Sequence, residues 1–425
     1  MKNIKSAASK FSFVILAVLV LATYGLAASK TTIYNFTGFK TFPADGALPL
    51  AGVTFDKAGN LYGTTTDGGN EACLEGGECG IVYRLTPPAQ TGGAWTESIL
   101  FEFGAGGQNS GGDPVFGVTI DQAGEVLGSD DFFVYRLVPG SGGTLPWTFQ
   151  QIYDPAPQQL ASSPTLDSAG NLYLTTAGTF GSLGSVFELK NQNGASPKTL
   201  WSFTGGADGA GPAAGVIRDS KGNLYGMAGS FHNPGGCGEV YELVPNAKHT
   251  AYTENTLYNF SGPEGCIPSP YNLILDANGN LYGSTAVGGT STLCQLGCGT
   301  VFELSPPVSG GSWTFQLLYD FQGGTDGATP SGVVRDAKGA LYGTTQIGGT
   351  GFCLLNGQSV GCGTIFKLTP PTGGGTWSET ILHSLQGGSD GQEPNGVTIG
   401  PDKALYGTTE LGGSFGEGTV FRILR

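Results

Sequence analysis

The feature that most constrains this chain is a phrase that it repeats. Residues 336–350 read DAKGALYGTTQIGGT, and closely related phrases begin at Asp56, Asp219, Asp276 and Lys403. The LYGTT part has seven copies at intervals of 46 to 65 residues, which begin at Leu61, Val126, Leu172, Leu224, Leu281, Leu341 and Leu405. Such a period indicates one structural unit built several times, with each copy burying its apolar surface against its neighbours.

Each repeat contains four short strand-like phrases in a fixed order, which we name A, B, C and D. In the sixth repeat they read SGVVRD, LYGTT, GTIFKLT and WSETILHSL. Val, Ile, Thr, Tyr and Phe dominate these phrases and Gly, Pro or Asp bound them, as is typical of β-strands. Seven units of four strands predict an all-β fold, a seven-bladed β-propeller of four-stranded blades. The alternative is an array of β-sandwiches, but apolar residues on both faces of phrase C favour blades packed between two neighbours.

The two ends of the chain predict how the ring closes. Residues 32–36 (TIYNF) have the pattern of a D phrase, whereas residues 418–424 (GTVFRIL) have the pattern of a C phrase. We therefore expect the N-terminal strand to join the last blade, which removes two exposed sheet edges. The expected organisation is a signal peptide at 1–27 and one propeller domain at 28–425. Residues 28–40 hold the outer strand of blade 7, and the blades span roughly 45–104, 110–155, 160–205, 208–261, 265–322, 326–386 and 390–425.

Phrases A and B are joined by D-x-x-G, in which Asp caps a tight hairpin and Gly adopts a positive φ. Six repeats have this glycine. The seventh has Gly400 in the position of the aspartate and Lys403 in the position of the glycine. We expect a hairpin of a different type in that blade.

The first residues predict export. Three lysines precede the apolar run FSFVILAVLVLA, and small residues follow it. This order is that of a secretory signal peptide, and the run is too short for an ordinary membrane span. A membrane anchor is the alternative. The formal net charge of −14, which becomes −17 without the three lysines of residues 1–27, disfavours nucleic acid and anionic membranes as partners. We expect a monomer that is secreted, periplasmic or at the cell surface, with no membrane insertion after signal removal.

The joined motif D-x-x-G-N-L-Y-G-T-T-x-x-G-G, followed by G-T-V-F-x-L, resembles the GloVer tandem repeat of exported bacterial proteins. The likeness covers nearly all of the chain after the signal, with blades 2 and 3 as the degenerate copies. The resemblance implies export and, in many members, a C-terminal surface anchor. This sequence ends on its last predicted strand, so no such anchor is expected. The resemblance implies no activity and no catalytic residues.

Eight cysteines in an exported chain predict disulfides rather than a zinc site, because their spacing does not fit paired zinc ligands. Cys79, Cys237, Cys298 and Cys362 all lie just before phrase C. Three of these have a partner in their own B–C loop. Cys237 has none, whereas Cys266 lies in the following D–A loop on the same side of the ring. The expected pairs are 73–79, 237–266, 294–298 and 353–362, formed by Cys73, Cys79, Cys237, Cys266, Cys294, Cys298, Cys353 and Cys362.

The B–C and D–A loops share one side of the ring, which we call the loop face. Most D–A loops carry the motif D-G-x-x-P, or E-G-x-x-P in blade 5. We expect the acids of this motif to surround one mouth of the channel as a ligand-binding group: Asp45, Asp208, Glu264, Asp326 and Asp390. Such a ring can bind Ca²⁺ or a cationic group through hard oxygen donors. The alternative is that each acid only caps its own turn.

These patterns favour a binding or interaction module that uses the loop face to bind a glycan, a peptide or a surface partner. Two alternatives stay open. One is an enzyme at the channel mouth, a lactonase-like hydrolase or lyase, and the other is a purely structural surface protein. An enzyme needs acids, amides or histidines that converge from several blades. The acids found here recur with the repeat, as turn residues do, so no catalytic residue is assigned and no cofactor other than possible Ca²⁺ is expected.

Overall fold

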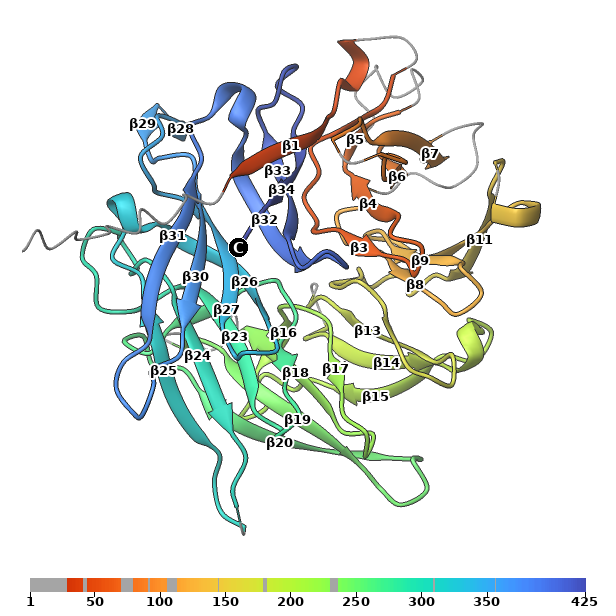
Figure 1. The fold of residues 1–425 in the computed structure, drawn as a ribbon. Coiled ribbons are helices and arrows are strands. Elements are labelled where there is room, and N and C mark those ends of the chain that lie inside the picture. Colours follow the sequence, from red (N-terminus) through yellow and green to blue (C-terminus); the bar gives the residue numbers. More distant parts are fainter. Residues whose placement is uncertain are drawn as a thin grey trace, which may run out of the picture.

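The structure is a computed structural model that describes residues 29–40, 44–69, 79–90, 92–104, 113–143, 145–178, 182–229, 236–308, 310–355 and 357–425. In this part of the chain the strands form seven antiparallel blades arranged in a ring (Figure 1). The predicted seven-bladed propeller is therefore confirmed. The predicted signal peptide lies outside the described residues.

The strands of the first four blades follow the predicted A to D order. Blade 1 is β3 (Thr54–Phe55), β4 (Leu61–Thr65), β6 (Ile81–Thr86) and β7 (Thr96–Glu102). Blade 2 is β8 (Thr119–Ile120), β9 (Val126–Ser129), β10 (Val134–Val138) and β11 (Thr148–Tyr153). Blade 3 is β12 (Thr165–Leu166), β13 (Leu172–Thr176), β14 (Ser185–Leu189) and β15 (Lys198–Ser202). Blade 4 is β16 (Ala210–Pro212) and β17 (Ile217–Arg218), which share position A, then β18 (Leu224–Gly229), β19 (Glu239–Pro245) and β20 (Tyr252–Asn259).

The remaining blades repeat this order. Blade 5 is β21 (Cys266–Pro268) and β22 (Ile274–Leu275), then β23 (Leu281–Val287), β24 (Thr300–Ser305) and β25 (Thr314–Asp320). Blade 6 is β26 (Ala328–Arg335), β27 (Leu341–Ile347), β30 (Thr364–Thr369) and β31 (Ser378–Ser384). Blade 7 is β32 (Gln392–Ile399), β33 (Leu405–Leu411), β34 (Thr419–Ile423) and β1 (Lys30–Asn35). Two short ribbons lie in loops, namely β2 (Gly46–Ala47) with β5 (Asp67–Gly68), and β28 (Leu354–Leu355) with β29 (Gln358–Ser359).

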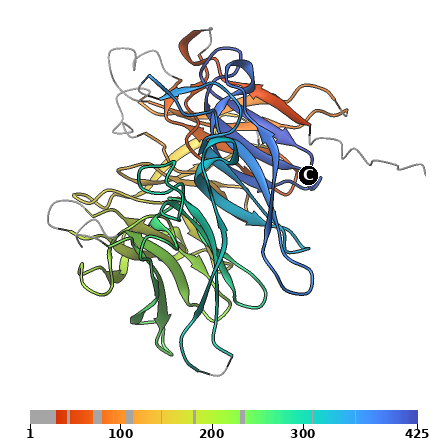
Figure 2. The same ribbon diagram turned by 90° about the vertical axis from the view of Figure 1, so that its left-hand side faces the viewer.

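The ring closes through the N-terminal strand, as predicted. Strand β1 pairs antiparallel with β34, from Lys30 opposite Ile423 to Asn35 opposite Thr419. Both ribbon views place the red strand against the blue strands of the C-terminal blade (Figures 1 and 2). The Lys30 ammonium, almost fully buried, lies 3.0 Å from the Asp390 carboxylate in the preceding D–A loop. The first and last strands therefore share one sheet, and β34 is not an edge.

The Leu, Tyr and Gly residues of the LYGTT phrase form the interior of each blade. In blade 6, Leu341 is fully buried and the Tyr342 hydroxyl donates to the Asp336 carboxylate at 3.1 Å. Position 343 requires glycine, because a Cβ there would lie 2.6 Å from the ring of Phe366 on the next strand. The three residues thus fill the core, cap the A–B hairpin and make room for an aromatic ring.

The two threonines of the phrase have different partners. The Thr344 hydroxyl donates to the backbone carbonyl of Pro394 in the next blade at 3.3 Å. The Thr345 hydroxyl lies 2.8 Å from that of Thr364 within its own blade. The first threonine therefore links neighbouring blades and the second links strands B and C. Both are fully buried, so leaving either hydroxyl without a partner would cost about 1–3 kcal/mol.

Aromatic contacts join one blade to the next near the loop face. At five of the seven junctions, the phenylalanine just after a D strand packs edge-on against an aromatic residue of strand C in the following blade, with ring centroids 5.1 to 5.4 Å apart. The pairs are Phe36 with Tyr83, Phe103 with Tyr135, Phe203 with Tyr241, Phe260 with Phe302, and Phe321 with Phe366. Such contacts add about 0.5–1.5 kcal/mol each beyond the area they bury. The first pair shows that the closing strand makes the same seam as the others.

The seventh A–B hairpin does not differ in type, and the prediction for it was wrong. The Gly400 amide donates to the Ala404 carbonyl and the Lys403 amide to the Gly400 carbonyl, at 2.8 and 2.9 Å, which repeats the pattern of the other hairpins. Lys403 itself takes the positive φ, at 67°. The capping carboxylate moves to Asp402, which accepts from the Ala404 amide and the Tyr406 hydroxyl, both at 3.1 Å.

Candidate functional site

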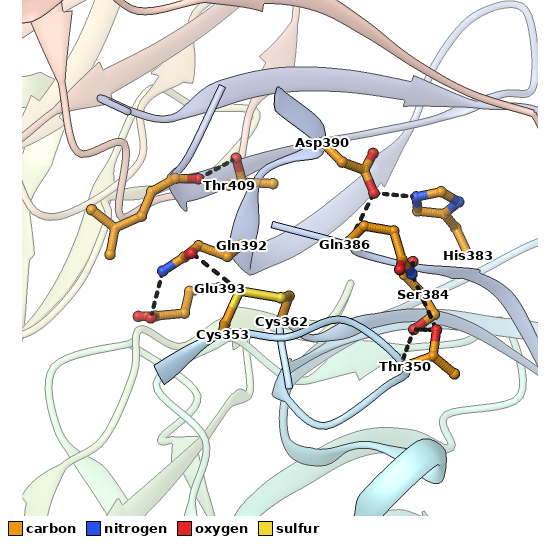
Figure 3. Close-up of a disulfide and its surroundings, with 11 residues drawn as sticks. Thr350, Cys353, Cys362, His383, Ser384, Gln386, Asp390, Gln392, Glu393 and Thr409 are labelled. Carbon is orange, nitrogen blue, oxygen red and sulfur yellow. Dashed lines mark hydrogen bonds and ion pairs between the residues drawn. A yellow bond between two sulfur atoms is a disulfide. The ribbon is translucent and has the colours of Figure 1, made fainter. Parts of the chain in front are cut away.

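Three of the four expected disulfides join described residues. Cys294 is bonded to Cys298 and Cys353 to Cys362, each within its own B–C loop, whereas Cys237 is bonded to Cys266 in the next D–A loop. Figure 3 shows the Cys353–Cys362 disulfide in the B–C loop of blade 6, beside Gln392 at the start of blade 7. Cys79 is also disulfide-bonded. Its expected partner, Cys73, lies outside the described residues.

The D–A carboxylates accept hydrogen bonds mainly from their own loops. The Asp208 carboxylate accepts from the Thr204 amide and hydroxyl at 2.9 and 2.6 Å. That of Asp326 accepts from the Gln322 amide and the Tyr319 hydroxyl, both at 2.6 Å. Asp45 has the same kind of partners, including the Tyr34 hydroxyl at 2.7 Å. This is the geometry of turn capping.

The two remaining acids are held at the same outer position. The Asp390 carboxylate accepts from the Gln386 amide and lies 2.8 Å from the His383 ring, as Figure 3 shows. Burial alone raises the pKa of Asp390, but the His383 hydrogen bond and the Lys30 ammonium outweigh it and hold the pKa well below its usual range. The Glu264 carboxylate accepts from the Ser261 hydroxyl at 2.5 Å.

The five acids contact their own loops and outer strands, and their expected role in ligand binding stays a prediction. The tyrosine and histidine partners lie on D strands, the outermost strands of the blades (Figure 1). None of the five acids lines the central cavity. The described residues also contain no group of three or more His, Cys, Asp or Glu side chains placed to hold a metal ion.

The axis of the ring holds a cavity of about 400 Å³. All seven blades contribute to its wall, mostly through the residues that lead into strand A or begin it. Its polar side chains are Thr54, Ser162, Ser163, Tyr271, Asn272, Gln346 and Asn395. The rest of the wall is glycine, proline and apolar side chains, and none of these described lining residues is charged. The cavity lies within the range of small-ligand sites, about 300–1,000 Å³.

Tyr271 is the largest polar side chain in this cavity. It reaches across the A strands of blades 6 and 7, where a Cβ on Gly332 or Gly396 would lie 2.6 or 3.1 Å from it. Its hydroxyl donates to the Asn395 side-chain oxygen at 3.3 Å, and the Asn395 amide group donates to the Pro49 carbonyl at 3.0 Å. Burial raises the pKa of Tyr271, and the nearby Glu410 carboxylate raises it further, so the phenol stays protonated. The wall therefore offers neutral donors and acceptors.

Sequence reasoning missed this site. The A phrase usually carries a glycine before its first strand residue, as in Gly52, Gly117 and Gly215, but blade 5 has Asn272 there and Tyr271 before it. This departure from the repeat was the available signal. The D–A carboxylates recur with the repeat, and such recurrence is typical of residues with a structural role.

The comparisons with known proteins agree with the fold. Residues 160–373 and 297–425 match the Gloeobacter/Verrucomicrobia repeat, which together is more than half of the chain. The chain belongs to this repeat family. The resemblance inferred from the LYGTT phrases is thereby confirmed. No curated protein matches the sequence.

Several solved structures resemble the protein at low identity. The extracellular domain of a proposed hybrid two-component system from B. thetaiotaomicron matches with a TM-score of 0.50 and 12% identity, over 92% of this chain and 41% of that one. This repeat protein thus spans less than half the length of that domain. A protein of unknown function from Dyadobacter fermentans matches at 0.44 and 10%, over 93% and 99% of the two chains. A gluconolactonase from Xanthomonas campestris matches at 0.41 and 13%, over 71% and 82%. At this identity the first match shows the fold alone, and the other two carry no functional argument.

Among the described residues, no helix is long and apolar enough to cross a membrane. The disulfides fit an extracellular protein, because cytosolic thiols are usually kept reduced. Repeat family, propeller fold and disulfides together fit an extracellular binding or structural module.

Proposed function

We propose that this exported repeat protein is a binding module whose central cavity accepts an uncharged, polyhydroxylated ligand such as the end of a glycan. The observation that carries the proposal is the composition of the cavity wall. Amide, hydroxyl and phenol groups from five blades face a space of about 400 Å³, and the described lining contains no charged side chain. Neutral donors and acceptors are satisfied by sugar hydroxyls without the desolvation cost of a buried charge.

The contrast with the rest of the molecule supports a neutral ligand. The whole chain has 33 acidic residues against 19 basic ones. A site meant for cations would be expected to use that acidity, yet the wall uses Asn272, Asn395 and Gln346 instead. The rings of Tyr271 and Phe116 add apolar surface on which the C–H face of a sugar can rest. The same lining supplies no carboxylate, histidine or cysteine for acid, base or nucleophilic chemistry, so binding is the function it supports best.

The test is a titration of the purified protein with neutral oligosaccharides and, in parallel, with uronic acids and amino sugars. Heat of binding and the shift in melting temperature are recorded for the wild type, Tyr271→Phe, Asn272→Ala and Gln316→Ala. Gln316 is exposed on the outer strand of blade 5 and serves as the control. Loss of one neutral hydrogen bond costs about 0.5–1.5 kcal/mol, so each channel variant is expected to weaken binding up to about tenfold. The control keeps the affinity of the wild type.

Two outcomes oppose the proposal. Binding that survives both channel substitutions unchanged would put the ligand elsewhere on the loop face. Binding of charged sugars in preference to neutral ones would contradict the reasoning from the neutral wall.

A further inference from the structure

Blade 4 departs from the repeat at a position that is otherwise uniform in the later blades. In blades 5, 6 and 7 the second threonine of phrase B lies 2.8 to 2.9 Å from a threonine at the start of strand C. The pairs are Thr285 with Thr300, Thr345 with Thr364, and Thr409 with Thr419. Blade 4 has Ala228 and Glu239 in these two positions, opposite each other in the sheet. The small residue makes the space that the carboxyl side chain fills.

The carboxyl group of Glu239 is buried without being satisfied. The residue is 2% exposed, and its Oε1 atom has no hydrogen-bond partner among the described residues. Burial, with added repulsion from Glu254 and Asp208, raises the pKa of Glu239 to about 8. Among the described residues, the phenol of Tyr241 is a further titratable group close to Glu239. A buried polar atom without a partner is rare in folded proteins and calls for an explanation such as a missing ligand.

A cavity of about 330 Å³ lies next to this group at the loop face. Gly205, Gly206, Ala207, Gly209 and Ala210 form one side of it, and Cys237, Gly238, Glu239, Asn259 and Phe260 contribute to the other. A Cβ on Gly209 would lie 2.9 Å from Glu239 Oε1, so this side chain reaches the glycine-lined wall. The described part of the wall has little side-chain bulk and holds a single acid.

The cysteine pattern also differs in blade 4. In blades 5 and 6 a disulfide packs over the glycine that follows strand D, with Cys298 and Cys353 sulfurs 2.9 Å from the Cβ position of Gly323 and Gly387. In blade 4 the cysteine bonds forward to Cys266 of the next blade. The corresponding Gly262 has no described residue within 4 Å of its Cβ position.

We propose that this blade 4 cavity is a second binding site, in which Glu239 receives a primary alkylammonium group on a slender chain, the chemistry of a lysine side chain. The ammonium donates to the unpartnered Oε1 atom, and the glycine and alanine wall contacts the methylene stem. The site differs in place and in ligand charge from the neutral central cavity, and neither proposal depends on the other.

Other acids around the cavity are less suited to the task. The Asp208 carboxylate already accepts two hydrogen bonds from Thr204. The Glu254 carboxylate accepts from the Thr256 hydroxyl at 3.3 Å and lies on the outer strand. Both acids add negative potential beside Glu239, which favours an incoming cation over an anion.

Binding is expected to be linked to a proton. Below pH 8 the free site holds Glu239 as a neutral acid. The ammonium favours the carboxylate, so the Glu239 proton passes to solvent as the ion pair forms. Affinity should therefore rise towards tenfold per pH unit between pH 6 and 7, and level off above pH 8.

The experiment is calorimetric titration of the intact protein with n-butylammonium. Tetramethylammonium, which is a cation but donates no hydrogen bond, and 1-butanol, which is neutral, are the comparison ligands. Titrations at pH 7 in two buffers of different ionisation enthalpy measure the protons released. Butylammonium is expected to bind with nearly one proton released at pH 7 and almost none at pH 9, and both comparison ligands are expected to bind at least tenfold more weakly.

Variants separate this site from the general acidity of the protein. Glu239→Gln is expected to weaken butylammonium binding at least tenfold and to abolish proton release. The double variant Ala228→Thr with Glu239→Thr restores the threonine pair of the other blades, so it should fold and lose the site. Glu379→Gln removes a half-buried acid with a raised pKa, in blade 6, and should bind as the wild type does. The proposal fails if butylammonium does not bind the wild type, if tetramethylammonium binds equally well, or if the folded double variant keeps the affinity.

Discussion

Blades 6 and 4 use the same backbone for different purposes. In blade 6 the paired threonines of strands B and C are fully buried and satisfy each other. In blade 4 the same two positions hold Ala228 and Glu239, and the Glu239 Oε1 atom has no hydrogen-bond partner in the part of the chain that the structure describes. Met227 also replaces the threonine or serine whose hydroxyl bonds to the next blade in the other repeats. Blade 6 therefore keeps the buried hydroxyl pair that stabilises the repeat. Blade 4 lacks this pair and its contribution to stability.

The difference teaches which departures deserve functional interpretation. The D–A acids recur and each has partners in its own loop, so they serve the fold. Glu239 and Tyr271 each occur once and interrupt a repeated pattern. In a repeat protein, neighbouring blades supply most of the stabilisation. One blade can then lose a hydroxyl pair, at a cost of a few kcal/mol, without unfolding the ring.

The largest expected effect comes from moving the glutamate of blade 4 into blade 6. Thr364→Glu places a carboxyl group at a fully buried position where Thr345 leaves no space. We expect a loss of about 4 kcal/mol or more in the free energy of unfolding, since the change combines overpacking with an unpaired charge. Thr364→Val, which removes only the hydroxyl, should cost about 1 kcal/mol. Denaturant unfolding measures both.

Adding Thr345→Ala to Thr364→Glu sharpens this comparison. The pair then has the side chains of blade 4, and part of the lost stability should return because the two residues are in contact. Strict additivity of the two single changes would mean that the alanine does not make room for the acid.

An effect of intermediate size is the dependence of folding stability on pH. The pKa of Glu239 is about 8 in the fold and about 4.3 in an unfolded chain, so the folded state holds more protons between these values. Stability should therefore be highest at the acidic end of that window and fall as pH rises to 8, by up to a few kcal/mol from this group. Glu239→Gln should flatten that part of the profile and stabilise the protein at pH 8.

Melting temperatures of the wild type and Glu239→Gln across pH 5 to 9 test the pH prediction. Glu97 and Glu379 also have raised pKa values, about 7, so some slope should persist in the variant. Parallel profiles for the two proteins would show that Glu239 is not the titrating group.

The smallest expected effect is the difference in stabilisation between the two kinds of disulfide. The Cys237 bond closes a separation of 29 residues and the Cys353 bond a separation of 9. On the chain-entropy estimate, removal costs about 4 kcal/mol for the longer loop and about 3 kcal/mol for the shorter one. Replacing both cysteines of each pair by serine and comparing denaturant midpoints measures the difference of about 1 kcal/mol. Equal or reversed costs would mean that local packing, and not loop length, sets the contribution of these bonds.

Much of the fold could be predicted from the sequence because the repeat states it seven times. The LYGTT phrases gave the number of blades, and the D phrase at residues 32–36 gave the closure that β1 makes with β34. The forward pairing of Cys237 followed from its missing loop partner. The hairpin at Gly400 was mispredicted because Lys403 can adopt a positive φ and Asp402 can cap from a neighbouring position.

The sites could not be predicted in the same way. The sequence by itself determined the strands, their order and the side of the ring on which each loop lies, because these depend on local pattern and on alternation of strand direction. Only the tertiary structure decided how far each loop residue lies from the axis. That distance placed the recurring acids against outer strands and brought Tyr271, Gln346 and Asn395 of three different blades to one cavity. It also decided that Glu239 Oε1 has no hydrogen-bond partner among the described residues, since burial and hydrogen bonding are set by neighbours that are distant in sequence.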